Sequence, residues 1–409
     1  MIVDLPSTTT KEISKRLVRL RQDVGAMALS RVLTLVLVVD EQKAEEAIQV
    51  ANDASHQHPC RIIAVVTGNK RGVSRLDAQI RVGGDAGASE VVVLRLYGPL
   101  TRHASSVVTP LLLPDSPVVV WWPAAAPKRI SEDSIGAMAQ RRITDAAKAK
   151  NPRAELKNRA ETYAPGDTDL AWTRITLWRG LLAAALDQPP YEPVLSATVT
   201  GGSDSPSADL LAAWLAQFLK CPVERARSRA GTGIVSVRLE RRAGNIDLVR
   251  PEGDTATLVQ PGQPDRTISL PHRSDAECLA DELRRLDPDE VYQEVMIEGM
   301  RRLAAPSKGK TASEAVAGGE APSVPEAERT LKRLRREARV EGRSVMVEEA
   351  PEPEGSSDTD TVKKAAARKL ASAKEAREGV ETAGETAENT DAAAEGADAT
   401  AGSGAGAGS

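Results

Sequence analysis

Residues 31–39 have the sequence RVLTLVLVV, a run of β-branched and apolar residues interrupted by one threonine. Such a run predicts a strand that is buried on both faces. Three more runs of this kind follow, RIIAVVT at 61–67, EVVVLRL at 90–96 and PVVVWW at 117–122. Segments with helical spacing, at 41–55 and 102–113, separate the strands. The alternation predicts βαβ units and a mostly parallel sheet.

An amphipathic helix is expected before the first strand. Thr9 and Glu12 have the spacing of a capping box. Apolar residues recur behind them at helical intervals, at Ile13, Leu17, Leu20, Val24 and Met27. The helix would cover one face of the sheet.

The chain beyond residue 122 has a different pattern. Residues 123–167 are rich in proline and alanine, which predicts short helices between two domains. Further helices are expected at 170–187, 206–220, 275–286 and 288–303, with a strand at 194–200. Five strand-length runs divided by turn signals predict an antiparallel meander, at 223–229, 234–242, 246–250, 255–260 and 267–270.

Aromatic residues make up only 2% of the 409 residues, and all of them lie between Tyr97 and Tyr292. The chain after Leu303 consists mainly of Ala, Gly, Ser, Glu and Lys, which cannot build a core. We therefore predict three parts: an N-terminal α/β domain of mostly parallel βαβ units at 1–165, a C-terminal mixed α/β domain with the meander at 166–303, and a disordered tail at 304–409.

The charge balance and the cysteines exclude several classes of protein. Lys and Arg number 54 against 58 Asp and Glu, which argues against a protein that coats nucleic acid. The early apolar runs are too short to span a bilayer, and the first ten residues lack a signal-peptide pattern, so we expect a cytoplasmic protein with no membrane contact. Three widely spaced cysteines, Cys60, Cys221 and Cys278, favour neither a disulfide framework nor a zinc site.

Catalytic and metal-binding signatures are weak. His56, His58 and Cys60 are zinc-ligand types, but no further Cys/His pair completes a site. The sequence contains no G-x-S-x-G motif and no convincing pair of acids for acid–base work. We expect no metal, no cofactor and no catalytic residue.

Tryptophan and arginine gather in three stretches that suit a protein interface. Trp121 and Trp122 end a buried strand, and Arg141 and Arg142 precede Asp145. Residues 167–179, DTDLAWTRITLWR, place Trp172 near Arg179 and put Arg174 and Trp178 at the i, i+4 spacing of a cation–π pair. These eight tryptophans and arginines are candidates for binding a partner. The alternative for the rings is packing into the core. For Arg141, Arg142 and Asp145, the sequence allows either a structural ion pair or an anion clamp.

A second candidate site would bind an anion. Residues 200–207, TGGSDSPS, connect a strand to a helix, and their glycines, serines and helix-start amides suit a phosphate. The loop residues concerned are Gly201, Gly202, Ser203, Ser205 and Ser207. On the meander, Arg225 and Arg227 share a strand face with Arg229, and Arg238 follows on the next strand. This basic face suits an anionic metabolite or an acidic protein surface. An ordinary capped turn and a solvated sheet face are the simpler alternatives.

Several of these strings together resemble one family, the OpcA-type glucose-6-phosphate dehydrogenase assembly proteins of actinobacteria and cyanobacteria. They are MIVDLPSTTT at 1–10, VVVWWP at 118–123, QRRITDA at 140–146, DTDLAWTRITLWR at 167–179 and TGGSDSPSADLLAAWL at 200–215. The resemblance covers about the first 303 residues and omits the tail.

The resemblance implies a non-enzymatic partner. Members of the family bind glucose-6-phosphate dehydrogenase, promote its active oligomer and raise its activity, which supports NADPH production in the oxidative pentose phosphate pathway. Thioredoxin control through cysteines, linked to cyanobacterial relatives, is not expected here because no two of the three cysteines are adjacent. The alternative function is a sugar-phosphate-binding enzyme or sensor of the same pathway.

Overall fold

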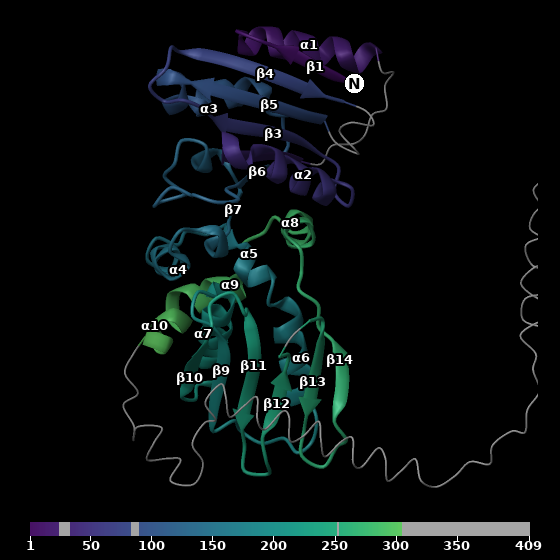
Figure 1. The fold of residues 1–409 in the computed structure, drawn as a ribbon, viewed down its shortest axis with the longest axis vertical. Helices are drawn as coiled ribbons and strands as arrows, with labels where there is room; N and C mark the ends of the chain where they lie inside the picture. The colour runs from purple at the N-terminus through teal and green to yellow at the C-terminus, as the bar shows by residue number, and fades with distance from the viewer. Residues whose placement is uncertain (24–32, 83–89, 252, 305–409) are drawn as a thin grey trace, which may run out of the picture. The chain divides into compact units, whose positions relative to one another are not determined.

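The computed structural model describes residues 1–23, 33–82, 90–251 and 253–304 (Figure 1). Two sheets of mixed direction, with helices packed on them, make up this part of the chain. The end of the predicted N-terminal helix, at Val24 and Met27, and the predicted disordered tail from residue 305 onward lie outside the described residues.

The first sheet has eight strands in the order β1-β4-β5-β3-β2-β6-β7-β8. Their bounds are β1 Ile2–Leu5, β2 Leu33–Asp40, β3 Cys60–Thr67, β4 Arg75–Arg81, β5 Glu90–Tyr97, β6 Val118–Trp121, β7 Arg141–Thr144 and β8 Asp167–Asp169. The run from β5 to β8 is parallel throughout, which confirms the predicted sheet. β4 runs antiparallel to β5, and β1 antiparallel to β4.

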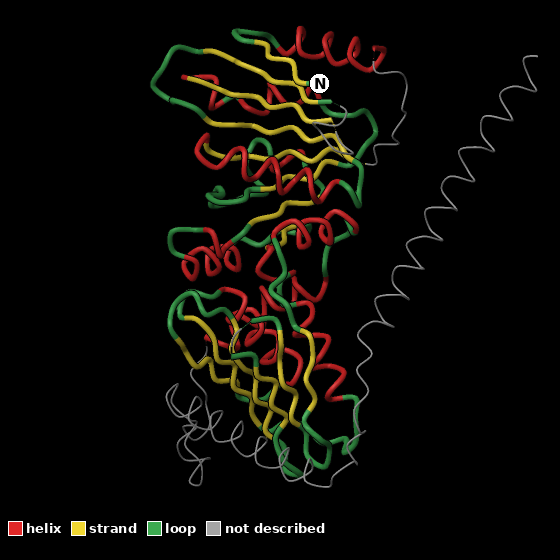
Figure 2. The backbone as a smooth tube through the Cα atoms, turned by 45° about the vertical axis from the view of Figure 1, so that its right-hand side comes forward, coloured by secondary structure: helices red, strands yellow, loops and turns green. Residues whose placement is uncertain are grey.

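Helices cover both faces of this sheet (Figure 2). They are α1 Thr10–Asp23, α2 Ala44–Ser55 after the 3₁₀ turn Glu41–Lys43, α3 Ala104–Val108 between the 3₁₀ turns Gly98–Arg102 and Thr109–Leu111, and α8 Asp275–Arg284. Alternate residues of each buried strand face opposite layers: Leu35 and Leu37 pack with α2 and α8, whereas Val36 packs with α1 and α3. The helix predicted at 102–113 is present in a shorter form, as α3 followed directly by the 3₁₀ turn that contains Pro110, whose missing amide hydrogen cannot continue the α-helical bonding.

The second sheet has six strands in the order β10-β9-β11-β12-β13-β14. Their bounds are β9 Ser196–Gly202, β10 Val223–Ser228, β11 Ile234–Glu240, β12 Ile246–Val249, β13 Thr255–Val259 and β14 Arg266–Ser269. The antiparallel meander is confirmed from β11 to β14. It was wrong for β10, which runs parallel to β9, because the crossover helix between them returns the chain to the same end of the sheet.

The remaining helices either follow the strands of the first sheet in the sequence or pack on the second sheet. They are the 3₁₀ turns Gly136–Met138 and Ala146–Lys148, α4 Pro152–Glu161, α5 Leu170–Thr173, α6 Thr176–Leu186, α7 Pro206–Leu219, α9 Glu290–Glu294, the π-helical turn η7 Val295–Gly299 and α10 Met300–Ala304. The predicted helix at 170–187 is thus two helices, broken at Arg174 and Ile175. Residues 123–167 contain α4 and the short turns, but also β7, which the sequence did not predict.

Helix α8 connects the two sheets. It follows the last strand of the second sheet, yet Cys278, Leu279 and Leu283 are buried in the core of the first sheet, beside α2. The helices after α8 return to the second core, where Tyr292 and Met296 are buried. Both β8 and α8 lie within the range predicted for the second domain, yet β8 is a strand of the first sheet and α8 covers that sheet. The domain bounds 1–165 and 166–303 stay a prediction. Among the described residues, no helix combines the length and apolar character needed to cross a membrane.

Shortening Leu279 tests this packing. Leu279→Ala leaves a cavity under α8, because the side chain is fully buried, and should lower the free energy of unfolding by about 2–5 kcal/mol. Chemical denaturation of the full chain measures the change. The control Leu177→Ala removes a side chain that is 40% exposed and should cost less than about 1 kcal/mol. Equal losses for the two variants would contradict the placement of α8.

Candidate functional site

Buried carboxylates lie where the parallel strands β7 and β8 end. Asp169, the last residue of β8, is fully buried and accepts hydrogen bonds from Thr144 Oγ1 at 2.6 Å, Ala146 N at 2.9 Å and Ala171 N at 2.9 Å. It therefore joins β7 to the start of α5. Burial, together with the nearby negative charge of Asp145, raises the pKa of Asp169 to about 6.

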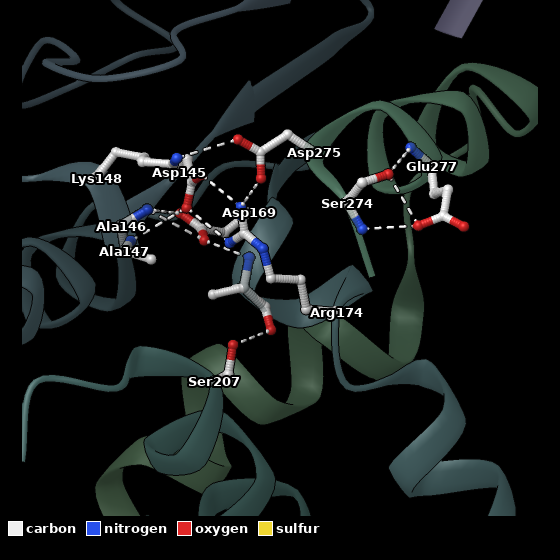
Figure 3. Close-up of polar contacts among 11 residues, drawn as sticks. Asp145, Ala146, Ala147, Lys148, Asp169, Arg174, Ser207, Ser274, Asp275 and Glu277 are labelled. Atoms are coloured by element: carbon white, nitrogen blue, oxygen red, sulfur yellow. Dashed lines mark hydrogen bonds and ion pairs between the residues drawn. The ribbon is translucent and has the colours of Figure 1, made fainter. Parts of the chain in front are cut away.

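Arg174 lies beside this carboxylate, in the break between α5 and α6 (Figure 3). Its guanidinium donates to both oxygens of Asp145, at 2.9 and 2.6 Å, and to Asp275 Oδ1 at 2.6 Å. Lys148 Nζ lies 3.3 Å from the other oxygen of Asp275. Arg174 thus holds the end of β7, the α5–α6 break and the first turn of α8 together.

The first turn of α8 is fixed by its own cap. The Ser274 hydroxyl accepts from the Glu277 amide at 3.2 Å, and Glu277 Oε2 accepts from the Ser274 amide at 2.7 Å. Asp275 is thereby presented to Arg174. Burial opposes the charge on Asp275, but the hydrogen bond and charge of Arg174 and the charge of Lys148 outweigh it, so the pKa of Asp275 lies below its ordinary value.

Arg141 and Arg142 form structural ion pairs, one of the two alternatives that the sequence allowed. Arg141 donates to Glu282 Oε2 from Nε at 3.0 Å and from Nη2 at 2.5 Å, linking β7 to α8. Arg142 Nε donates to Asp167 Oδ1 at 2.5 Å, linking β7 to β8. Asp145, which the sequence placed with them, pairs with Arg174 instead.

The four candidate tryptophans are buried. Their exposed fractions are 2% for Trp121, 1% for Trp122, 1% for Trp172 and 2% for Trp178. Trp121 and Trp122 pack on opposite faces of the first sheet, and Trp172 and Trp178 in the second core. The four rings are therefore part of the core in this structure, which is the alternative to an exposed binding surface. Contact of these tryptophans and of Arg141, Arg142, Arg174 and Arg179 with a partner stays a prediction.

Of the two arginine–tryptophan pairs that the sequence brings near each other, one is in contact and the other is not. The Arg179 guanidinium lies 3.6 Å from the centre of the Trp172 ring. Arg174 does not stack on Trp178, because the helix breaks between them and the i, i+4 geometry is lost; Arg250 lies 5.1 Å over that ring instead. Burial lowers the pKa of Arg179 to about 10.

The Gly/Ser loop connects β9 to α7, and the structure brings Arg225 against it. Arg225 Nη1 donates to Gly201 O at 3.0 Å, Nη2 to Gly202 O at 2.7 Å and Nε to Asp209 Oδ1 at 2.8 Å. The guanidinium therefore holds carbonyl oxygens and a carboxylate of the protein itself. Burial lowers the pKa of Arg225 despite the charge of Asp209.

The loop serines also have internal roles. Ser205 caps α7, the Ser207 hydroxyl donates to Ala171 O at 2.9 Å, and the Ser203 amide donates to Ser228 O at 3.2 Å. Gly201 permits close packing, since a Cβ there would lie 2.6 Å from a carbonyl oxygen, that of Gly233. These contacts match the simpler alternative, a capped turn, and anion binding at the loop stays a prediction.

Of the two other predicted arginines, Arg227 lies opposite Gly201 in the pairing of β10 with β9, and Arg238 lies on β11. Arg238 lies on the half-exposed face of the second sheet and pairs with Asp247 at 2.7 Å. Arg227 is exposed and, with Arg225, lines a cavity of about 630 Å³ between α4, β10 and the η7–α10 segment. Sequence patterns missed this cavity because its walls come from segments far apart in the chain.

Two sequence models of one family match the chain consecutively. The model described as the glucose-6-phosphate dehydrogenase subunit N-terminal domain matches residues 51–161, and that of the C-terminal domain matches residues 165–296. Together they cover more than half of the chain. The chain belongs to the OpcA family of glucose-6-phosphate dehydrogenase assembly proteins. The family resemblance of the sequence is thereby confirmed.

Curated relatives of this OpcA family member are cyanobacterial. The OxPP cycle protein OpcA of Synechococcus elongatus is 29% identical over 198 residues, 45% of this chain and 42% of that protein. The OpcA of Nostoc punctiforme is 25% identical over 187 residues, 42% of this chain and 40% of that protein. The chain thus spans less than half of the length of either relative.

Likeness to solved structures is weak. An oxidoreductase from Sinorhizobium meliloti covers 67% of this chain, with 95% of its own chain, at 11% identity and a TM-score of 0.34. A score this low supports no conclusion about fold or function. The OpcA family assignment therefore depends on sequence.

Removing Arg174 tests the joint at α5. Arg174→Met leaves Asp145 buried without its cation, and the free energy of unfolding should fall by about 3–5 kcal/mol in chemical denaturation. The control Arg129→Met breaks an exposed pair with Glu132 and should cost less than about 1 kcal/mol. A loss for Arg174→Met as small as that of the control would show that the joint contributes little.

The raised pKa of Asp169 predicts the direction in which the free energy of unfolding changes with pH. Between pH 4 and 6 the unfolded carboxyl ionises before the folded one, so the free energy of unfolding should fall as the pH rises, by about 3 kcal/mol for a shift to about 6. Chemical denaturation at several pH values in this range should show that the free energy of unfolding changes less with pH in Asp169→Asn than in wild type. The control Asp265→Asn, at an exposed site, should keep the wild-type dependence. Identical dependence in wild type and Asp169→Asn would contradict the shift.

Proposed function

We propose that this chain is a non-catalytic partner that binds glucose-6-phosphate dehydrogenase, favours its active oligomer and raises its activity. The consecutive match to both domains of the OpcA family supports this proposal most directly. The names of the cyanobacterial relatives place those proteins in the oxidative pentose phosphate cycle. We propose the same pathway, in the cytoplasm, for this chain.

The physical basis is selective binding. A protein that binds the active oligomer of an enzyme more tightly than its inactive form shifts the population toward the active oligomer. Such a partner needs a rigid surface, and the ion pairs of Arg141 and Arg174 fix β7, α8 and the α5–α6 break to one another. By reciprocity, assembly of the dehydrogenase should also strengthen binding of this chain.

A sugar-phosphate enzyme or sensor is the second function that the sequence allowed. It has less support, because the arginine at the Gly/Ser loop already holds the loop carbonyls and Asp209. A sugar phosphate would have to displace these contacts.

Mixing the full chain with the glucose-6-phosphate dehydrogenase of the same organism tests the proposal. We expect a complex of larger mass by light scattering and a higher rate of NADPH formation at the same enzyme concentration. The chain alone, given glucose 6-phosphate and NADP⁺, is the control and should form no NADPH. No complex and no change in rate would contradict the proposal, and turnover by the chain alone would favour an enzyme.

A further inference from the structure

A groove runs beside the outer strand of the second sheet. Helix α4, the edge strand β10 and the η7–α10 segment enclose about 630 Å³, within the usual range of binding sites. β10 is the outermost strand, paired with β9 alone (Figure 1). None of the contacts that join the two sheets at Arg174 uses the residues of this groove.

The floor of the groove is apolar. Its side chains come from all three walls: Leu156, Ala160, Val223, Met296, Ile297, Met300 and Leu303. Leu156 and Met296 belong to the core, whereas Ile297, Met300 and Leu303 are half-buried and remain open to the groove. Unbranched methionines adapt to differently shaped apolar partners.

Cations outnumber acids around this floor. The cationic residues are Arg153, Lys157, Arg225, Arg227 and Arg301, and the acidic ones are Glu161 and Asp209. Asp209 is occupied, since it pairs with buried Arg225 at 2.8 Å and lies 3.8 Å from Arg153. The groove therefore carries an excess of positive charge at its rim.

The rim cations are available to a partner. Lys157 is 77% exposed, and its pair with Glu161 at 3.7 Å is of a kind that contributes little to stability. Arg301 is 74% exposed in a similar pair with Glu298. Arg227 is exposed and, within the described ranges, has no carboxylate within 4 Å. Exchanging such weak pairs for a partner's carboxylates costs little.

The chemistry of the floor distinguishes among anionic ligands. A sugar phosphate has hydroxyl groups that need polar partners, and an apolar floor would leave them unsatisfied. The deepest cation, Arg225, already donates to Gly201, Gly202 and Asp209. A protein segment with apolar side chains flanked by carboxylates satisfies both the floor and the rim.

We propose that this groove binds an acidic amphipathic segment of a partner protein, with its apolar side chains on the floor and its carboxylates at Lys157, Arg227 and Arg301. The inference rests on the proposed function and identifies where the dehydrogenase makes contact. Because the charges are exposed, they accelerate association and orient the segment, and binding weakens as salt increases.

Charge reversal at the rim tests the inference with the full chain. Lys157→Glu combined with Arg227→Glu changes two exposed side chains, so the fold should persist. The double variant should bind the dehydrogenase about tenfold or more weakly in calorimetry or light scattering. The matched control Lys70→Glu with Arg242→Glu makes the same change of charge at exposed residues outside the groove and should bind within about twofold of wild type.

The other outcomes separate this inference from the proposed function. If the groove variant binds the dehydrogenase with wild-type affinity, the inference about the groove is wrong and the proposed function is unaffected. Failure of the wild-type chain to bind would overturn both. Calorimetric binding of inorganic phosphate or glucose 6-phosphate that is lost in the groove variant, with dehydrogenase binding unchanged, would assign the groove to a small anion and overturn the inference.

Discussion

The guanidinium of Arg174 joins the end of the first sheet, the start of the second core and the returning helix α8. Such a joint is demanding, because removing charges from water costs several kcal/mol for each ion unless nearby partners compensate. Here Asp145 and Asp275 each accept from Arg174 at 2.6 Å, and Lys148 lies 3.3 Å from Asp275. These contacts tie the end of β7, the α5–α6 break and the first turn of α8 to one another.

This requirement explains why the string DTDLAWTRITLWR at 167–179 is so distinctive. Asp167 pairs with Arg142, Asp169 caps α5, and Thr173 Oγ1 donates to Glu282. With Arg174, which pairs with Asp145 and Asp275, four polar residues of the string have partners elsewhere in the chain. Substituting Asp167, Asp169 or Arg174 leaves a buried group without its partner, which is costly. A sequence this specific is consistent with a structural role as much as with a binding role.

In the first sheet, the sequence predicted the strands that are continuous apolar runs and missed the others. β2, β3, β5 and β6 were all predicted, whereas β4, RLDAQIR, alternates polar and apolar residues near the sheet edge. β7, RRIT, is buried although it begins with two arginines, since their partners lie 25 and 141 residues away. No local pattern shows such partners. For the same reason the tryptophans could be identified as important but not assigned to core or surface.

The return of α8 makes the core of the first sheet depend on a helix that is synthesised after the second sheet. The first sheet lacks one of its covering helices until Leu283 has been made, long after its own strands are complete. Translation proceeds at roughly 5–20 residues per second, so the face that α8 covers stays without this helix for several seconds while the second sheet is synthesised. Truncation within the second sheet would remove α8 and uncover the apolar side chains of α2 and the first sheet on which it packs.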